Sequence, residues 1–153
     1  MNKKRVGFVG FGKRVENVYM PIFEKTNSIF EISGFCTRRH ERGEYVSSKF
    51  GIKKFKSNEE VCKESDLVIA FMPPKNQFDV LEKISKLSNN ILIETPVLDQ
   101  RVMTIQDSNI CVGEQWPFLP LEQFKRLYIE KGILEVPFYA HNDCRSFDYH
   151  AIA

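Results

Sequence analysis

The sequence predicts an α/β protein built on a doubly wound parallel sheet. Short apolar runs alternate with segments of helical periodicity over residues 1–115, and strand–helix–strand repeats form parallel sheets with right-handed crossovers. The first apolar run ends at Gly10-Phe11-Gly12, which favours a tight turn between a strand and a helix. The strand predicted over residues 133–140 is not part of this alternation.

The first half of the chain contains three predicted strands and two predicted helices. Pro21 interrupts a run of apolar residues at helical spacing, so the first helix should be kinked or divided there. Gly51 follows a polar helical segment and suits a helix C-cap. In chain order, these elements are a strand over 5–9, a helix over 15–23, a strand over 30–36, a helix over 40–50 and a weak strand over 52–55.

The second half continues the alternation. Ser57 and Glu60 have the capping-box spacing, so a helix should begin there. Residues 67–71, Leu-Val-Ile-Ala-Phe, are the clearest buried strand in the chain. The remaining elements are a helix over 80–87, strands over 91–93 and 110–113, a helix near 119–131 that stops at Gly132, and a strand over 133–140 outside the alternation.

Composition argues against several function classes. The 22 basic and 20 acidic residues give a net charge of +2, too weak a basic field for a nucleic-acid surface. No apolar run approaches the ~20 residues of a membrane span. The basic N-terminus lacks the cleavage site of a signal peptide, which favours a cytoplasmic protein. The four cysteines form no Cys-x-x-Cys pair, so no metal site is expected.

The turn after the first strand is the predicted phosphate site. Gly10 permits the tight turn, and Gly12 lets the backbone approach a pyrophosphate at the helix N-terminus. Val15 stands where the third glycine of the dinucleotide fingerprint would be. The candidate cofactor-binding residues in this stretch are Gly10, Phe11, Gly12, Lys13 and Arg14.

The end of the second strand indicates which dinucleotide fits. An acidic residue there would bind the ribose 2′-hydroxyl of NAD. This chain has Thr37, Arg38 and Arg39 instead, and arginine binds phosphate with a planar fork of donors. We therefore expect NADP rather than NAD. The alternative is that these residues are a solvated basic start to the next helix.

Four stretches together resemble the Gfo/Idh/MocA oxidoreductases, named for glucose–fructose oxidoreductase and inositol dehydrogenase. They are V-G-F-V-G-F-G, S-D-L-V-I-A-F-M-P-P, I-L-I-E-T-P, and G-E-Q-W-P-F-L-P followed by a helix and K-G-I-L. The resemblance implies an NAD(P)-binding Rossmann domain, here residues 1–115. It implies a C-terminal domain with the substrate pocket, of which 116–153 would be the truncated start. It also implies hydride transfer between a nicotinamide and a small sugar-like, carbonyl or imine substrate.

Carried over to this chain, the resemblance marks matches and departures. Thr95 stands at the E-K-P lysine, which commonly moves a proton in the family, and a threonine hydroxyl cannot replace a tuned lysine in that role. His150 resembles the catalytic histidine, but Ser146 stands where an aspartate is expected. Gln77 occupies a frequent histidine position. The other positions that the resemblance assigns to the cofactor site are Met72, Pro73, Pro74, Glu94 and Pro96.

Two further interpretations stay open. Thr95 and the short second domain also fit a non-catalytic nucleotide-binding module or subunit, or an inactive fragment of a longer oxidoreductase. The predicted strand over 133–140 alternates apolar and polar residues, and its apolar face needs a cover. A homo-oligomer or a partner chain would supply that cover, and a small-molecule substrate is the other expected partner.

Overall fold

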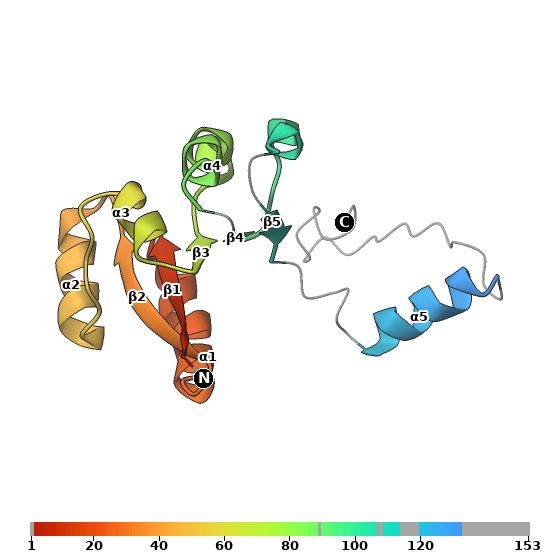
Figure 1. Cartoon of the computed structure of the whole chain (residues 1–153), viewed down its shortest axis with the longest axis horizontal. Coiled ribbons are helices and arrows are strands. Elements are labelled where there is room, and N and C mark those ends of the chain that lie inside the picture. The colour runs from red at the N-terminus through yellow and green to blue at the C-terminus, as the bar shows by residue number, and fades with distance from the viewer. Residues whose placement is uncertain (1, 89, 107–108, 114–119, 133–153) are drawn as a thin grey trace. The chain divides into compact units, whose positions relative to one another are not determined.

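A computed structural model of the chain describes residues 2–88, 90–106, 109–113 and 120–132. Figure 1 shows its helices and strands. In chain order they are β1 (Lys4–Val9), η1 (Val15–Tyr19), α1 (Met20–Lys25), β2 (Phe30–Cys36), α2 (His40–Phe50), α3 (Asn58–Lys63), β3 (Leu67–Ala70), η2 (Pro74–Asn76), α4 (Gln77–Ser85), β4 (Asn90–Ile93), η3 (Gln100–Thr104), β5 (Asn109–Val112) and α5 (Pro120–Glu130).

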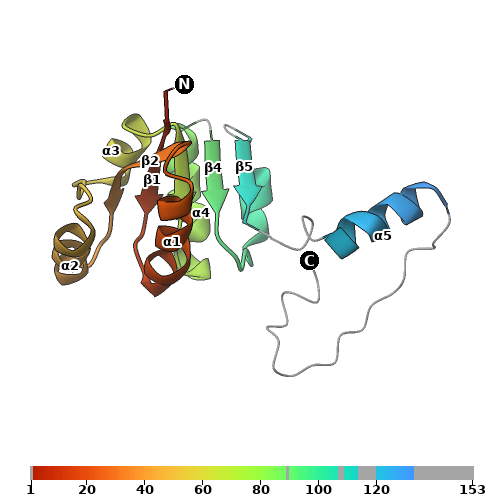
Figure 2. The same cartoon turned by 90° about the horizontal axis from the view of Figure 1, so that it is seen from below.

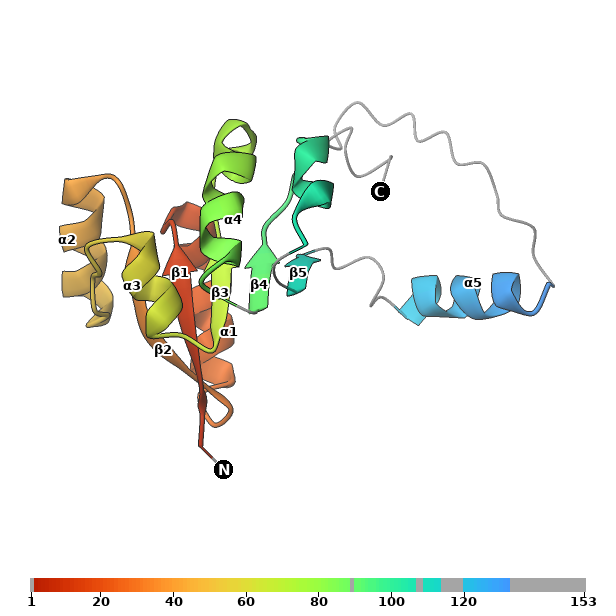
Figure 3. The same cartoon turned by 45° about the horizontal axis from the view of Figure 1, so that its top comes forward.

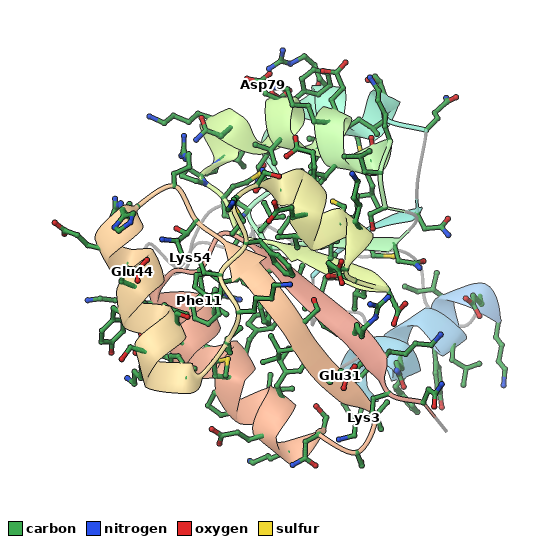
Figure 4. The ribbon with its side chains drawn as sticks, turned by 60° about the vertical axis from the view of Figure 1, so that its left-hand side comes forward. Lys3, Phe11, Glu31, Glu44, Lys54 and Asp79 are labelled. Carbon is green, nitrogen blue, oxygen red and sulfur yellow. The ribbon has the colours of Figure 1, made fainter. Side chains whose placement is uncertain are left out.

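The five strands form one parallel sheet in the order β2-β1-β3-β4-β5. Lys54 adds an isolated parallel bridge to Phe35 of β2, so the weak strand predicted over 52–55 extends the sheet beyond β2. Backbone hydrogen bonds of Phe35 to the residues on either side of Lys54 form this bridge. Lys54 also forms an ion pair of 2.7 Å with Glu44 of α2, and both side chains are labelled in Figure 4. With that bridge counted, the strand order is the doubly wound order that the alternation predicted.

Helices cover both faces of the sheet, as Figures 2 and 3 show. Successive side chains of a strand point to opposite faces. Accordingly, Val6 and Phe8 of β1 join the core cluster beneath η1, α1 and α2, whereas Val9 joins the cluster beneath α3 and α4. Val46 of α2 and Leu81 of α4 are both fully buried, one in each cluster. The chain therefore buries two cores, which is the doubly wound architecture predicted from the sequence.

The predicted local signals act where expected. The first helical segment is divided into the π-helical η1 and α1, and Pro21 lies in the first turn of α1. Gly51 ends α2 with a φ of 65°, a left-handed conformation that favours glycine. Ser57 caps α3 by accepting a hydrogen bond of 3.3 Å from the backbone N–H of Glu60. The helix predicted over 80–87 begins earlier, at Gln77.

The contacts divide the chain into Met1–Gly113 and Glu114–Ala153. Of the second unit, the structure describes α5, which ends before Gly132 as predicted. The strand predicted over 133–140 lies outside the described residues. Among the described helices, none has the length and apolar character that crossing a membrane requires.

Candidate functional site

The ends of β1, β2 and β3 meet at Gly10. The backbone N–H of Gly10 donates to the carbonyl oxygen of Cys36 at 2.8 Å, and the N–H of Phe71 donates to Val9 at 2.7 Å. Gly10 has a φ of 86°, and a Cβ added to it would overlap the carbonyl oxygen of Phe71. The predicted tight turn is therefore present, and this position requires glycine.

A cavity of about 510 Å³ opens beside this turn, at the carboxyl ends of the first three strands. This is the place at which doubly wound sheets bind ligands. Eight predicted cofactor-binding residues line it, namely Gly10, Phe11, Gly12, Thr37, Arg38, Arg39, Met72 and Pro73. Other lining residues that the sequence argument did not select include Arg42, Asn58, Asn76 and Asp79.

The two central residues of the turn differ in what they can offer a ligand. The ring of Phe11 lies in the core against Phe8 and Phe35, with centroids 5.5 and 5.0 Å away, and the residue is 2% exposed. Figure 4 labels it beside α2. Because the ring is packed in the core, only the backbone of Phe11 is available to a ligand. A Cβ on Gly12 would meet no atom within 4 Å. The space over Gly12 is therefore open to an approaching group.

The basic residues after β2 face solvent at the cavity. Arg38 and Arg39 are exposed and Thr37 is partly buried. Among the described residues, neither arginine is in an ion pair. Asp79 of α4 is the acidic residue of the described lining. Two guanidinium groups are thus available to an anionic ligand, and β2 is not followed by a carboxylate.

Arg42 in the first turn of α2 was missed by the sequence argument. Its Nε donates to the carbonyl oxygen of Phe11 at 3.1 Å, and its Nη2 donates to Glu16 Oε2 at 2.5 Å. Glu16 also accepts hydrogen bonds from Lys49 Nζ at 2.6 Å and Tyr45 Oη at 2.9 Å. The hydrogen bonds from Lys49, Arg42 and Tyr45 lower the pKa of Glu16 to about 2.

Glu94 lies at the end of β4, and its carboxylate is used within the protein. Oε1 accepts from Arg14 Nε at 2.9 Å and from Tyr19 Oη at 2.6 Å. Oε2 accepts from the backbone N–H of Thr95 at 2.9 Å and from its hydroxyl at 3.4 Å. Glu94 is 5% exposed. Burial, and then the hydrogen bond to Glu94, raise the pKa of Tyr19 far above its ordinary value.

This cluster relates two predicted sites to each other. Arg14 follows the predicted phosphate turn, and Thr95 stands where the resemblance implies a lysine. Glu94 joins them through its two oxygens. Arg14 Nε thus donates a hydrogen bond to a residue 80 positions later in the chain, and the Arg14 side chain is 57% exposed. The described cavity lining includes neither Arg14 nor Lys13.

Gln77 contacts the loop that follows β4. It is fully buried, and its Nε2 donates to the carbonyl oxygen of Pro96 at 2.7 Å. Its Oε1 has no hydrogen-bond partner among the described residues. The Thr95–Pro96 peptide bond is cis. Pro74, another predicted residue, begins η2 beside the cavity. Gln77 and Pro96 therefore contact each other and are not part of the described cavity lining.

His150, the predicted catalytic histidine, lies outside the described residues. Within the described part of the chain, no group of three or more His, Cys, Asp or Glu side chains is placed to hold a metal ion. A second hollow of about 660 Å³ lies at the amino ends of the strands. There the carboxylate of Asp66 accepts from the backbone N–H of Arg5 at 2.8 Å, so this group is engaged within the protein.

Comparison with known proteins yields one family and several similar chains. The model of the Gfo/Idh/MocA oxidoreductases, described as an oxidoreductase family with an NAD-binding Rossmann fold, matches residues 4–110. Pyrroline-5-carboxylate reductase of Arabidopsis thaliana is 30% identical over 106 residues, which are 67% of this chain and 38% of that protein. The chain spans 34% and 38% of the length of two curated relatives that it matches.

Two solved structures illustrate the similarity in fold. The WlbA dehydrogenase from Bordetella pertussis, in complex with NADH and UDP-GlcNAcA, has a TM-score of 0.69 and 16% identity, over 86% of this chain and 43% of that one. KijD10, a 3-ketoreductase from Actinomadura kijaniata in complex with NADP and TDP-benzene, has a TM-score of 0.68 and 16% identity, with the same coverage. At these identities the likeness establishes the fold.

Proposed function

This chain belongs to the Gfo/Idh/MocA oxidoreductase family, and we propose that it binds NADP(H) in the cavity beside Gly10–Gly12. We propose hydride transfer between the nicotinamide and a small sugar-like, carbonyl or imine substrate as its reaction. The observation that carries the proposal is a glycine turn at the carboxyl ends of β1, β2 and β3, next to two exposed arginines without ion-pair partners in the described chain.

The turn suits the pyrophosphate of a dinucleotide. Gly12 leaves open space in which phosphate oxygens can approach the backbone, and the helical segment behind it directs free N–H groups toward an anion. The adenosine half would then lie toward the end of β2, where Thr37, Arg38 and Arg39 line the cavity. Phe11 contributes through its backbone, since its ring belongs to the core.

The preference for NADP rests on this chain's own residues. KijD10 is in complex with NADP and WlbA with NADH, so similar folds accommodate either dinucleotide. In this chain the end of β2 offers a hydroxyl and two guanidinium groups, and guanidinium groups bind a 2′-phosphate through paired donors. No carboxylate follows β2 to accept a hydrogen bond from the 2′-hydroxyl of NAD.

The catalytic part of the proposal concerns the loop after β4. When bound, the nicotinamide ring supplies or accepts the hydride, and a protein group must move a proton at the substrate oxygen. We propose His150 for that proton, with the Thr95 hydroxyl as a hydrogen-bonding group. We also propose that residues 1–115 are the dinucleotide-binding domain and that residues 116–153 begin the substrate or oligomerisation domain. A second copy of the chain or a partner chain would cover the apolar face of the strand predicted over 133–140.

A second candidate is a nucleotide-binding module without catalysis. The geometry of Thr95 favours it, because the backbone and hydroxyl of Thr95 are both directed to Glu94. Replacement of Thr95 by lysine separates the two candidates. Dehydrogenase activity that appears in Thr95→Lys but not in the parent chain would favour a binding module derived from an enzyme. Turnover by the parent chain would exclude the second candidate.

Titration with NADPH and with NADH, followed by the fluorescence of the reduced nicotinamide, tests the binding proposal. We expect tighter binding of NADPH. A combined Arg38→Ala and Arg39→Ala variant should lose at least about tenfold of that preference, since a charge-assisted hydrogen bond contributes ~1.5–3 kcal/mol and ~1.4 kcal/mol equals tenfold.

The matched control is a combined Lys25→Ala and Lys63→Ala variant. It removes the same charge from two exposed residues at the far ends of α1 and α3, so it should leave the preference unchanged. Failure of the parent chain to bind either dinucleotide would remove the proposed function. Equal binding of both would remove the NADP preference alone.

A further inference from the structure

We propose that Arg42 is a positioning residue that holds the Gly10–Gly12 turn in its ligand-binding conformation. In this role it strengthens the binding of NADP(H) and NAD(H) by the same factor, and Glu16 holds it in place. This inference rests on the proposed dinucleotide site and assigns a role there to two residues that the family resemblance did not point to.

The first step concerns the direction of a carbonyl group. A turn that binds an anion must present N–H groups to it, since a carbonyl oxygen facing a phosphate would repel it. Phe11 lies between the two glycines of the turn, and its carbonyl oxygen accepts the hydrogen bond from Arg42 Nε at 3.1 Å. Arg42 thus engages the acceptor whose rotation toward the ligand would do most harm to anion binding.

The second step is that Arg42 is itself fixed. Its side chain is 23% exposed, and its Nη2 is bonded to Glu16, whose side chain is 13% exposed. The guanidinium also lies over the ring of Tyr45, 5.0 Å from the centroid. Lys49 Nζ holds the other oxygen of Glu16 at 2.6 Å. A guanidinium bonded on two edges and covered on one face has little freedom to swing toward the ligand.

The third step closes a ring of contacts around the turn. Glu16 belongs to η1, and its backbone N–H donates to the carbonyl oxygen of Gly12 at 3.2 Å. The ring therefore runs from the turn into η1, through the Glu16 carboxylate to Arg42 of α2, and back to the carbonyl oxygen of Phe11. It fixes the turn relative to α2 independently of any ligand, which is what preorganisation of a binding site requires.

The three arginines near the cavity have different proposed roles. Arg38 and Arg39 are exposed at the cavity and have no ion-pair partner in the described chain, so they suit direct contact with a 2′-phosphate. Arg42 acts on the turn, which meets the pyrophosphate that both dinucleotides share. Loss of Arg42 should therefore weaken both ligands equally, whereas loss of Arg38 and Arg39 should change the ratio between them.

The test compares Arg42→Met, Arg42→Lys and Glu16→Gln with the parent chain by NADPH and NADH titration. Methionine keeps much of the apolar packing and removes the donors. We expect Arg42→Met to weaken both ligands by about tenfold, with an unchanged ratio of the two dissociation constants. Arg42→Lys should recover only part of this loss, because an ammonium lacks the planar fork that reaches Phe11 and Glu16 together. Glu16→Gln should produce a smaller loss of the same kind.

The affinities of a double variant test whether Arg42 and Glu16 act on dinucleotide binding together. The loss in a combined Arg42→Met and Glu16→Gln variant should be smaller than the product of the two separate losses, because both changes break one ring of contacts. Circular dichroism and thermal melts check that the variants fold. If Arg42→Met does not fold, Glu16→Gln with the same two titrations decides the matter.

Three results would overturn the inference. The first is an affinity loss confined to NADPH in Arg42→Met, which would make Arg42 a direct 2′-phosphate ligand. The second is unchanged affinity for both dinucleotides. The third is a combined variant whose affinity loss equals the product of the two separate losses. Should the parent chain bind neither dinucleotide, inorganic pyrophosphate serves as the probe. Stabilisation of the parent chain by pyrophosphate, absent in Arg42→Met, would support the positioning role although the proposed function had failed. Equal responses of the two chains would refute it.

Discussion

Replacement of Gly10 by alanine should damage the fold, whereas replacement of Gly12 should damage binding alone. At Gly10 the φ of 86° places an L-residue in the left-handed region, which costs ~1–2 kcal/mol. The added methyl group would also overlap the carbonyl oxygen of Phe71, and relief of such a clash by backbone movement costs ~1–3 kcal/mol. The expected loss in the free energy of unfolding is therefore ~2–5 kcal/mol.

Thermal melts followed by circular dichroism measure this loss. For a unit of this size, 1 kcal/mol corresponds to a change in Tm of ~4 °C, so Gly10→Ala should melt at least about 8 °C below the parent chain. Gly12→Ala introduces no clash and no positive φ, so its Tm should stay within ~4 °C of the parent value. Its affinity for a dinucleotide should fall, since the methyl group occupies the open space over the turn. A Gly10→Ala chain with the parent Tm would refute this reasoning.

Three further predictions concern titratable groups. The lowered pKa of Glu16 means that its ionised form stabilises the fold above about pH 4.5; urea melts should show the stability difference between the parent and Glu16→Gln shrinking from pH 4.5 toward pH 2, and a constant difference would contradict this. Tyr19→Phe removes a hydrogen bond to the buried Glu94 carboxylate and should cost ~1.5–3 kcal/mol in urea melts at pH 7. Because the pKa of Tyr19 is raised, the difference should be full below pH 10 and decline only above it, and an early decline would count against the bond. Bound NADPH should slow alkylation of Cys36, which lines the cavity, while the exposed Cys111 reacts at its usual rate in the same mass-spectrometric assay; equal slowing of both would point to a global effect.

Local chemistry explains why much of the fold was predictable. β2 was predicted with the bounds that the structure has, because aromatic and β-branched residues such as Phe30, Ile32 and Phe35 favour a strand and are at least partly buried in the sheet. Pro21, Gly51 and Ser57 act on their own neighbours in the chain, so their effects on helix bounds follow from the sequence. The start of α4 was placed too late, since Gln77 carries no apolar signal and is buried through its contact with Pro96.

The site was less predictable because its decisive contacts join distant residues. Eight residues of the predicted site line the cavity, since strand ends in a parallel sheet meet at one edge. Arg42 has no motif that distinguishes it from Arg38 or Arg39, and its bond to Phe11 depends on how α2 packs. Arg14 illustrates the same limit, because an arginine beside a phosphate turn can reach either a ligand or a carboxylate 80 positions away.

The position of β1 in the middle of the sheet bears on how the protein is synthesised. β1 leaves the ribosome before β2 and β3, and its second neighbour in the sheet, β3, begins at Leu67 opposite Val6. At ~5–20 residues per second, these 61 positions correspond to a delay of ~3–12 s. During that time the nascent chain carries a strand whose last four residues, Val6 to Val9, are buried in the folded protein, and one edge of this strand is unpaired. We therefore expect nascent chains that end between β2 and β3 to aggregate and to bind chaperones. Nascent chains that already include β3 can pair both edges of β1 and should do so less.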